Sequence, residues 1–461
     1  MASSTAGIPG AQENRFDVEA FIDGRRIGGR EVMMLVVCSL VLFIDGFDMY
    51  FFGKILPAIA HGLDAKPADM DVVIFWTYVG MAVGAFLMPP LADKVGRRPV
   101  LGLCALCFGV LSIMGAYAQT VTQMAVLRGV SGIFFSAMLP IGLALLSEMT
   151  PRRWRAGFMA MALVLFSAGN AASGVIAAWL LDLYGWQIGF WVGGVLGFVA
   201  VPLLMLIPES LAFRLARNPQ DPKIPATIKL LDASAPISAG STFQYGNRPP
   251  REKSGAGPLA LLHKPYFLQT MILWVACFIS LGNIALLTNW MATFFQELGG
   301  IPIQEFAVSA MISFIGGATG TLIMGFLMDR VNPYWLIAAF FLVEAVALFL
   351  LGQVPFSSGI FLGALIVWNF TQVGGQTGIN NLATLSYPPE MRSSGIGWAG
   401  GWGRVAGIVL APFAGAAALR MMLPLETIMT LIATMAVAVA VLIVALGIFA
   451  PAFGPRAASR N

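Results

Sequence analysis

The sequence predicts an all-α integral membrane protein with 12 transmembrane helices, arranged as two six-helix bundles related by pseudo-symmetry. Three observations support this prediction: the composition, the length of the apolar runs and a weak internal repeat. Of the 461 residues, 58% are hydrophobic and only 11% are charged, and the mean hydropathy is +0.81. Soluble globular chains carry about 25% charged residues. A chain this long and this apolar needs lipid to cover its surface.

Twelve apolar runs are long enough to cross the hydrocarbon core, which takes about 20 residues. Because no water satisfies the backbone there, runs of this length indicate helices rather than barrel strands. The first run is too long for a cleavable signal peptide, and a mixed-charge tail precedes it. The runs are residues 33–60, 72–92, 99–118, 121–148, 157–182, 186–207, 267–295, 305–328, 334–352, 358–386, 394–420 and 425–450.

Lys and Arg are distributed unequally between the two sides of the predicted membrane. With the N-terminus assigned to the cytoplasm, 22 of the 27 Lys and Arg lie in cytoplasmic segments. Only Lys66 and Arg420 lie outside, and the other three are within the runs. Because positive charge collects on the cytoplasmic side of membrane proteins, both termini are expected in the cytoplasm.

A connection rich in Pro, Ser, Gly and basic residues divides the runs six and six. This composition is typical of a partly ordered linker rather than a domain with its own core. The predicted organisation is an N-terminal cytoplasmic tail (1–32), a first bundle (33–207), a cytoplasmic linker (208–266), a second bundle (267–450) and a C-terminal tail (451–461).

The internal repeat consists of two charged-loop features in register. Asp-Lys-Val at 93–95 follows the second run, and Asp-Arg-Val at 329–331 follows the eighth. The pattern Pro-x-x-x-Arg occurs at 151–155, after the fourth run, and again at 388–392, after the tenth. Duplicated six-helix halves are a recurring transporter architecture, with the substrate site between them near the midplane.

Several motifs resemble a known family. The segment Leu-Ala-Asp-Lys-Val-Gly-Arg-Arg at 91–98 resembles the loop between helices two and three of the major facilitator superfamily, although Pro89 replaces the usual Gly. The first run carries Asp-Gly-Phe-Asp at 45–48. The string Tyr-Pro-Pro-Glu-Met-Arg at 387–392 precedes Gly-Ile-Gly-Trp and Gly-Arg within 395–404. Together they resemble the aromatic acid:proton symporter branch, over about residues 30 to 450.

This resemblance implies the major facilitator fold in a plasma (bacterial inner) membrane. It implies import of a small aromatic carboxylate, such as hydroxybenzoate, protocatechuate, vanillate or a related lignin-derived acid, by proton symport with alternating access. The expected partners are that anion, a proton and the lipid bilayer, with no nucleic acid, no cofactor and no enzymatic activity; the protein is expected to be a monomer. The alternatives are a proton-coupled exporter of aromatic or drug-like compounds and a membrane sensor that transports nothing.

Two acidic residues of the first run are the proton-coupling candidates. Asp45 and Asp48 are three residues apart and therefore share one helical face. An ionisable group at bilayer depth is costly and is a functional candidate by default. Two carboxylates that face one low-dielectric cavity do not ionise easily together, which suits a proton carrier. The alternative is a polar pair bonded to neighbouring helices.

Four other charged residues lie in the interior of the runs, and two of them, Arg128 and Arg404, have competing interpretations. Arg128 lies within about 10 Å of the depth of Asp48 and can either clamp a substrate carboxylate or form a static ion pair. Arg404 can belong to the substrate site or extend to the cytoplasmic surface. Lys54 is expected to extend toward the outer surface, and Glu344 to be a bystander with one hydrogen-bonded partner.

Polar and aromatic side chains of four runs complete the substrate-binding prediction. Asn and Gln within runs seven and ten can form hydrogen bonds, and aromatic side chains can stack on a ring. These candidates are Tyr50, Asn283, Asn289, Trp290, Gln376 and Trp398, with Thr288, Asn369, Gln372, Asn380 and Asn381 as further polar candidates in the same runs.

Charged residues at the cytoplasmic mouths of the runs are the gating candidates. They are expected to form salt bridges that break when the carrier opens inward; the alternative is that the basic ones only set the topology. The candidates are Asp93, Arg97, Arg98, Glu148, Arg155, Asp329, Arg330 and Arg392. No metal site is expected, since all four cysteines fall within apolar runs.

Overall fold

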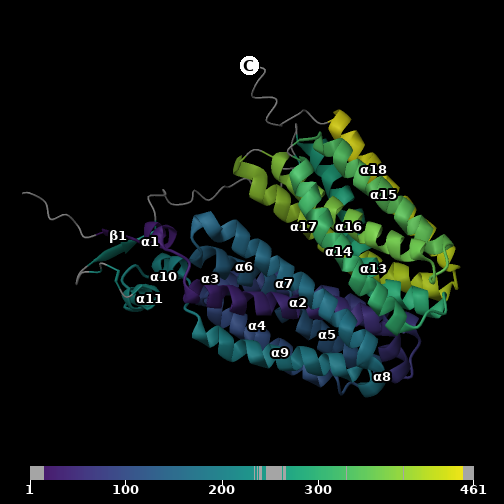
Figure 1. Cartoon of the computed structure of the whole chain (residues 1–461), viewed down its shortest axis with the longest axis horizontal. Coiled ribbons are helices and arrows are strands. Elements are labelled where there is room, and N and C mark those ends of the chain that lie inside the picture. The colour runs from purple at the N-terminus through teal and green to yellow at the C-terminus, as the bar shows by residue number, and fades with distance from the viewer. Residues whose placement is uncertain are drawn as a thin grey trace, which may run out of the picture.

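The computed structural model describes residues 15–232, 234–235, 237, 241–245, 262, 266–328, 330–387 and 389–449, without the side chains of 15, 389–394 and 396. Two bundles make up most of the molecule (Figure 1). The first contains α2 (Gly29–Gly62), α3 (Asp71–Val95), α4 (Arg97–Gly115), α5 (Val121–Phe135), α6 (Met138–Met149), α7 (Arg152–Trp179) and α9 (Gln187–Leu206). The second contains α13 (Phe267–Glu297), α14 (Ile303–Met328), α15 (Pro333–Gln353), α16 (Gly359–Leu385), α17 (Pro389–Arg420) and α18 (Leu425–Phe449).

Eleven helical segments among the described residues are long and apolar enough to cross a membrane, with α5 and α6 counted as one span. The predicted run that is not among these eleven is the tenth, 358–386, which corresponds to α16; this helix has 27 residues but is interrupted by amide side chains. These amides make α16 more polar than the other spans, and their contacts are described with the site below.

Helix pairing is the same in both halves, as the internal repeat predicted. In the first half, α2 packs on α7, α3 on α5, and α4 on α9. In the second half, the equivalent pairs are α13 with α17, α14 with α16, and α15 with α18. The two halves are therefore copies of one packing scheme, which confirms the expected pseudo-symmetry.

The fourth predicted run is not one continuous helix. It breaks at Ser136–Ala137, between α5 and α6. Pro140 has no backbone N–H and cannot bond to the carbonyl of residue 136, so the helical ladder is interrupted at that turn. The break leaves the first turn of α6 inside the bundle, where its backbone N–H groups can contact side chains of α2.

The two halves touch at one end. We call the end that holds the connections 95–97 and 149–152 the linker end, and the opposite end, with η1 (Pro67–Met70) and α8 (Leu181–Tyr184), the far end. The inter-half contacts join α2 to α13, α7 to α14, and α3 and η1 to α17. In Figure 1 the bundles converge at the end carrying α8 and diverge toward the linker end.

Polar contacts across this junction lie in the far-end connections. Arg420 Nη2 is 2.8 Å from Asp71 Oδ2, and His61 Nε2 is 3.1 Å from Glu297 Oε1. Among the described residues, no ion pair joins the two halves at the linker end. The far end is therefore closed by direct contacts.

The described parts of the tail and the linker contain short helices and strands. Strand β1 (Arg15–Asp17) pairs in parallel with β2 (Thr242–Gln244), beside α1 (Val18–Gly24), α10 (Leu211–Arg217) and α11 (Lys223–Leu231). These short elements bury their own apolar side chains and join the core of the first half at its linker end. The buried residues include Val18, Ile22, Ile224, Ile228 and Leu231.

Candidate functional site

A cavity of 220 Å³ lies between the two halves. Its walls are formed by α2 and α7 of the first half and by α13, α14 and α16 of the second. Phe306, Trp368 and Tyr50 contribute aromatic surface to it. Among the described lining residues, Lys54 is the one charged side chain. A mostly apolar cavity with a single cation is suited to a small anion that carries a ring.

Lys54 is buried and points into α7 rather than toward water. Its Nζ donates to the Asn170 carbonyl oxygen at 2.8 Å, to Asn170 Oδ1 at 2.8 Å and to Ser173 Oγ at 2.7 Å. The expectation that Lys54 extends to the outer surface is therefore wrong, because α7 supplies acceptors at mid-bundle. All three acceptors are neutral, so an ammonium group here lacks a counter-charge and attracts an anion.

Close packing holds α2 beside the cavity. Gly53, next to Lys54, faces the backbone of α13, and a Cβ at this position would lie 2.0 Å from the Thr288 carbonyl oxygen. Only glycine allows the two helices this close approach. The contact places Lys54 on the first-half wall directly opposite residues of the second half.

Asp48 and Arg128 form a buried ion pair, which is the second of the two predicted alternatives. Arg128 Nη1 lies 2.8 Å from each carboxylate oxygen of Asp48. The guanidinium also lies over the Phe52 ring, 4.8 Å from its centroid. Neither partner lines the cavity. Arg128 is therefore engaged within the first half and is not placed to clamp a ligand in this conformation.

Asp45 is also buried, with 5% of its surface exposed. It interacts with the backbone amide of Leu139, in the first turn of α6, and lies close enough to Asp48 for their charges to interact. The free N–H groups at a helix N-terminus favour negative charge. Among the described residues, no Lys or Arg forms an ion pair with Asp45. Because the fourth span breaks before α6, the backbone amide of Leu139 is free to contact Asp45.

Tyr50 and Gln376 line the cavity, as do the further candidates Thr288, Asn369 and Gln372. Tyr50 does so from α2, and Gln376 does so from α16. Gln376 Oε1 accepts a hydrogen bond from Ser280 at 2.7 Å, and its Nε2 donates to Asn380 at 3.0 Å. The amide of Gln376 therefore already has partners on both sides.

The other predicted binding residues are outside the described lining. Asn289 donates to Tyr78 across the halves at 3.2 Å, and the Trp290 indole donates to the Ala411 carbonyl and joins α13 to α17. Asn283 is buried, and its Oδ1 has no partner among the described residues. For Asn289 and Trp290, the contacts indicate packing rather than ligand binding.

Trp398 and Arg404 are on α17 and are solvent- or lipid-accessible. Trp398 is 43% exposed and stacks on Trp274, with ring centroids 5.8 Å apart. Arg404 is exposed and has no ion-pair partner among the described residues. Neither lines the cavity, so their assignment to the substrate site finds no support in this conformation.

The sequence assigned Lys54 to the outer surface rather than to the cavity, and it did not single out Trp368. A signal for Lys54 existed: Tyr50 and Lys54 are one turn apart on α2, and Asn170 and Ser173 are one turn apart on α7. Such paired polar positions on two apolar helices indicate a shared interior contact. Trp368 had no comparable signal, since most aromatic residues of a membrane protein face lipid or core.

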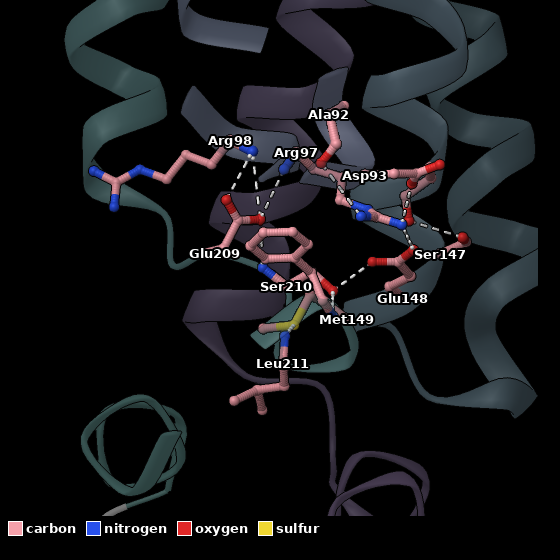
Figure 2. Close-up of polar contacts among 12 residues, drawn as sticks. Ala92, Asp93, Arg97, Arg98, Ser147, Glu148, Met149, Glu209, Ser210 and Leu211 are labelled. Atoms are coloured by element: carbon pink, nitrogen blue, oxygen red, sulfur yellow. Dashed lines mark hydrogen bonds and ion pairs between the residues drawn. The ribbon is translucent and has the colours of Figure 1, made fainter. Parts of the chain in front are cut away.

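Several gating candidates form a network at the linker end of the first half (Figure 2). Arg97 Nη2 is 2.9 Å from Asp93 Oδ1 and 3.2 Å from Glu148 Oε1. Glu148 also accepts a hydrogen bond from Ser210, the residue that precedes α10. The network joins α3, α4, α6 and the start of the linker, so that the first half is braced as one unit.

Glu209 was missed by the sequence and lies at the centre of this network. Its carboxylate accepts the backbone N–H groups of Arg97 and Arg98, each at 3.2 Å, at the N-terminus of α4. Gly96 has φ +123°, and a Cβ there would lie 2.3 Å from Glu209 Oε2. Burial raises the pKa of Glu209, while its backbone hydrogen bonds and Arg214 act in the opposite direction. A glycine at residue 96 is thus needed both for the turn and for this contact.

The remaining gating candidates do not join the network through an ion pair. Arg98 donates to the Leu204 carbonyl at the end of α9 at 2.9 Å, and Arg155 donates to the Thr150 carbonyl at 3.3 Å. Arg330 lies over the Phe326 ring at 4.0 Å. Asp329 lies outside the described residues, as does the side chain of Arg392. A gating role for this set stays a prediction.

Comparisons with known proteins agree with this architecture. The family model described as Major Facilitator Superfamily matches residues 38–412. A gallate transporter of Pseudomonas putida is 32% identical over 94% of this chain and 95% of its own. The 4-hydroxybenzoate transporter PcaK of the same organism is 31% identical over 90% of this chain and 92% of its own. A benzoate transport protein of Acinetobacter baylyi is 25% identical over 88% of each chain.

Solved structures show the same fold at low sequence identity. A bacterial homologue of the human lysosomal transporter Spinster has a TM-score of 0.66 at 14% identity and covers 92% of this chain and 97% of its own. The nucleoside transporter NupG has a TM-score of 0.66 at 13% identity and covers 90% of this chain and 99% of its own. The fold and cavity define a membrane transporter rather than an enzyme. The chain belongs to the Major Facilitator Superfamily, and its similarity to aromatic-acid transporters confirms the motif resemblance.

Proposed function

We propose that this protein imports small aromatic carboxylates by proton symport with alternating access. The observation that carries the proposal is the position of Lys54, the single charged group among the described lining of a cavity with aromatic walls. The relatives named for gallate, 4-hydroxybenzoate and benzoate support an aromatic acid as the substrate. Hydroxybenzoates, protocatechuate, vanillate and related acids fit this description.

The substrate carboxylate binds at Lys54. A contact between the Lys54 ammonium and a carboxylate has charge on both partners, so it is stronger than the contacts of Lys54 with the neutral acceptors of Asn170 and Ser173. The ring then lies among Tyr50, Phe306 and Trp368. The first half holds the charge of the ligand, and the second half holds much of its apolar surface.

The proton binds at the pair Asp45 and Asp48. Asp48 is neutralised by Arg128, which leaves Asp45 as the buried carboxylate with no ion-paired cation among the described residues. Proton uptake at Asp45 removes a charge from the low-dielectric interior while the halves rearrange. If more than one proton accompanies each anion, the membrane potential contributes about 2.3 kcal/mol per elementary charge per 100 mV.

Alternating access requires the far-end contacts to break and the linker end to close. With the predicted orientation, the present arrangement is open toward the cytoplasm, since the halves meet only at the far end among the described residues. The network of Arg97, Glu148 and Ser210 keeps the linker end of the first half rigid during this movement. Rigid halves that rock about a central site are the usual basis of such transport.

Proteoliposomes that contain the purified protein, with labelled 4-hydroxybenzoate and an imposed pH gradient, test this proposal. The wild type is expected to accumulate the acid on the alkaline side, and a protonophore should abolish accumulation. Asp45→Asn or Asp48→Asn should abolish accumulation and retain some exchange of labelled for unlabelled substrate. Protonophore-sensitive accumulation by the Asp45→Asn, Asp48→Asn double variant would refute this proton path. Proton-driven extrusion would support an exporter, and binding without flux would support a sensor.

A further inference from the structure

Two polar side chains of α16 line the cavity without a hydrogen-bond partner among the described residues. These are the indole Nε1 of Trp368 and the amide of Gln372, whose Oε1 and Nε2 are both unpaired. Gln372 is 3% exposed, so bulk water does not satisfy it. The two residues are four apart and share one face of the helix.

Their neighbours on α16 differ from them in this respect. Asn369 donates to Ser313 at 3.1 Å, and Gln376 is bonded to both Ser280 and Asn380. The same helix therefore supplies partners for some of its cavity amides and leaves others open. An unpaired buried polar group is destabilising, and native structures keep few of them. Three such atoms belong to two residues that line one cavity wall, so a ligand in the cavity is a candidate partner for them.

The unpaired atoms define the chemistry of that ligand. Gln372 offers one acceptor and two donors, and Trp368 offers one donor. A phenolic hydroxyl matches this set, because it can donate to Gln372 Oε1 while its oxygen accepts from Gln372 Nε2 or Trp368 Nε1. Lys54, on the opposite wall of the same cavity, binds a carboxylate. A ligand with both groups on one ring satisfies both walls.

We infer that Trp368 and Gln372 determine substrate specificity by binding a ring hydroxyl, so that hydroxylated aromatic acids are selected over unsubstituted ones. The inference rests on the proposed function, since it requires an aromatic carboxylate anchored at Lys54. An acid without the hydroxyl leaves the amide and the indole N–H unpaired after it has displaced water. Sites built to bond a hydroxyl reject analogues that lack it for this reason.

Isothermal titration of the purified full-length protein with benzoate and with 2-, 3- and 4-hydroxybenzoate tests the inference. In the wild type, at least one hydroxybenzoate should bind about 10- to 100-fold more tightly than benzoate. Gln372→Met keeps the approximate volume but removes the amide, and should reduce this preference to about threefold or less. Trp368→Phe keeps an aromatic wall but removes the N–H, and should reduce the preference by a smaller factor.

Gln376→Leu is the matched control. Gln376 lines the same cavity, but its amide is already bonded within the protein, so its loss should change the affinities for benzoate and hydroxybenzoate by the same factor. Loss of the hydroxyl preference in Gln376→Leu, to the same degree as in Gln372→Met, would overturn the inference.

The remaining outcomes separate the inference from the proposed function. Equal binding of all four acids by the wild type, or an unchanged preference in Gln372→Met, overturns the inference and leaves the proposed function intact. If Gln372→Met binds none of the acids, the preference in Trp368→Phe decides, and an unchanged value overturns the inference. Failure of the wild type to bind any of the four acids contradicts the proposed function itself.

Discussion

The two halves share one packing scheme but bury different chemistry. The first half buries four charged side chains in the interior of its spans, Asp45, Asp48, Lys54 and Arg128, besides Glu31 and Asp71 at the helix ends. The second half faces the same cavity with neutral groups, namely amides, hydroxyls and the indole of Trp368. Gene duplication can supply the scaffold, but each copy then acquires its own side chains. Under the proposed function, the first half therefore handles charge, from both substrate and proton, and the second half recognises the ring.

Glu344 is the one buried charged residue of the second half among the described residues. It is fully buried on α15 and does not line the cavity. Neither of its carboxylate oxygens has a hydrogen-bond partner among the described residues. The expectation of one hydrogen-bonded partner is therefore wrong. Glu344 lies away from both the cavity and the Asp48–Arg128 pair, so it belongs neither to the charged groups of the first half nor to the cavity lining of the second.

The largest expected effect comes from breaking the charge pair of the first half. Asp48→Asn leaves Arg128 buried without its counter-charge, and loss of one partner of a buried pair costs about 3–5 kcal/mol. We expect a large fall in the apparent Tm of the purified protein, measured by differential scanning fluorimetry. Gln376→Leu, in the second half, should lower it less, because only neutral hydrogen bonds are lost.

The matched control removes both charges. Asp48→Leu combined with Arg128→Met should recover much of the stability lost in Asp48→Asn, since an apolar pair can replace a buried ion pair. It should not recover proton-driven accumulation. If Asp48→Asn is as stable as the wild type, the ion pair between Asp48 and Arg128 does not stabilise the first half.

A smaller effect is expected where the two halves meet. Arg420 is half-exposed, and its ion pair with Asp71 joins α17 to α3 at the far end. An exposed pair contributes about 0.2–1 kcal/mol, so Arg420→Gln should increase the population open at the far end by about two- to fivefold. Labelling of Ser313→Cys by an impermeant thiol reagent from that side measures this population. Arg420→Lys, which keeps the charge, should show little change; an equal increase in both variants would exclude the ion pair as the cause.

The smallest expected effect is a pH dependence at the linker end of the first half. Burial raises the pKa of Glu209 above its ordinary value of 4.5, so the folded protein holds that proton more tightly than the unfolded chain. Its contribution to stability is present below pH 4.5 and is lost as the pH rises through the raised pKa. Glu209→Gln should therefore gain apparent Tm relative to the wild type as the pH rises from about 4.5 through the raised pKa. A constant difference across this range would contradict the assignment.

The sequence predicted most of the fold, because hydropathy and length determine which segments cross the membrane. It also predicted the proximity of Asp48 and Arg128, which follows from their depths in two spans. It did not predict the break before α6, since the effect of Pro140 depends on whether neighbouring groups replace the lost hydrogen bond. It misjudged Lys54, since the burial of a side chain depends on the rotation of its helix and on the acceptors of the next one. Asn170 and Ser173 become partners of Lys54 only when α2 and α7 are packed.

The central claim is that an aromatic carboxylate is anchored by Lys54. The most direct test compares the binding of 4-hydroxybenzoate and its neutral amide, 4-hydroxybenzamide, to the wild type and to Lys54→Met. The account predicts that Lys54→Met weakens binding of the acid by about 100-fold, since losing one partner of a buried charge pair costs about 2–5 kcal/mol, and changes binding of the amide little. An unchanged preference for the acid over the amide in Lys54→Met would contradict the account.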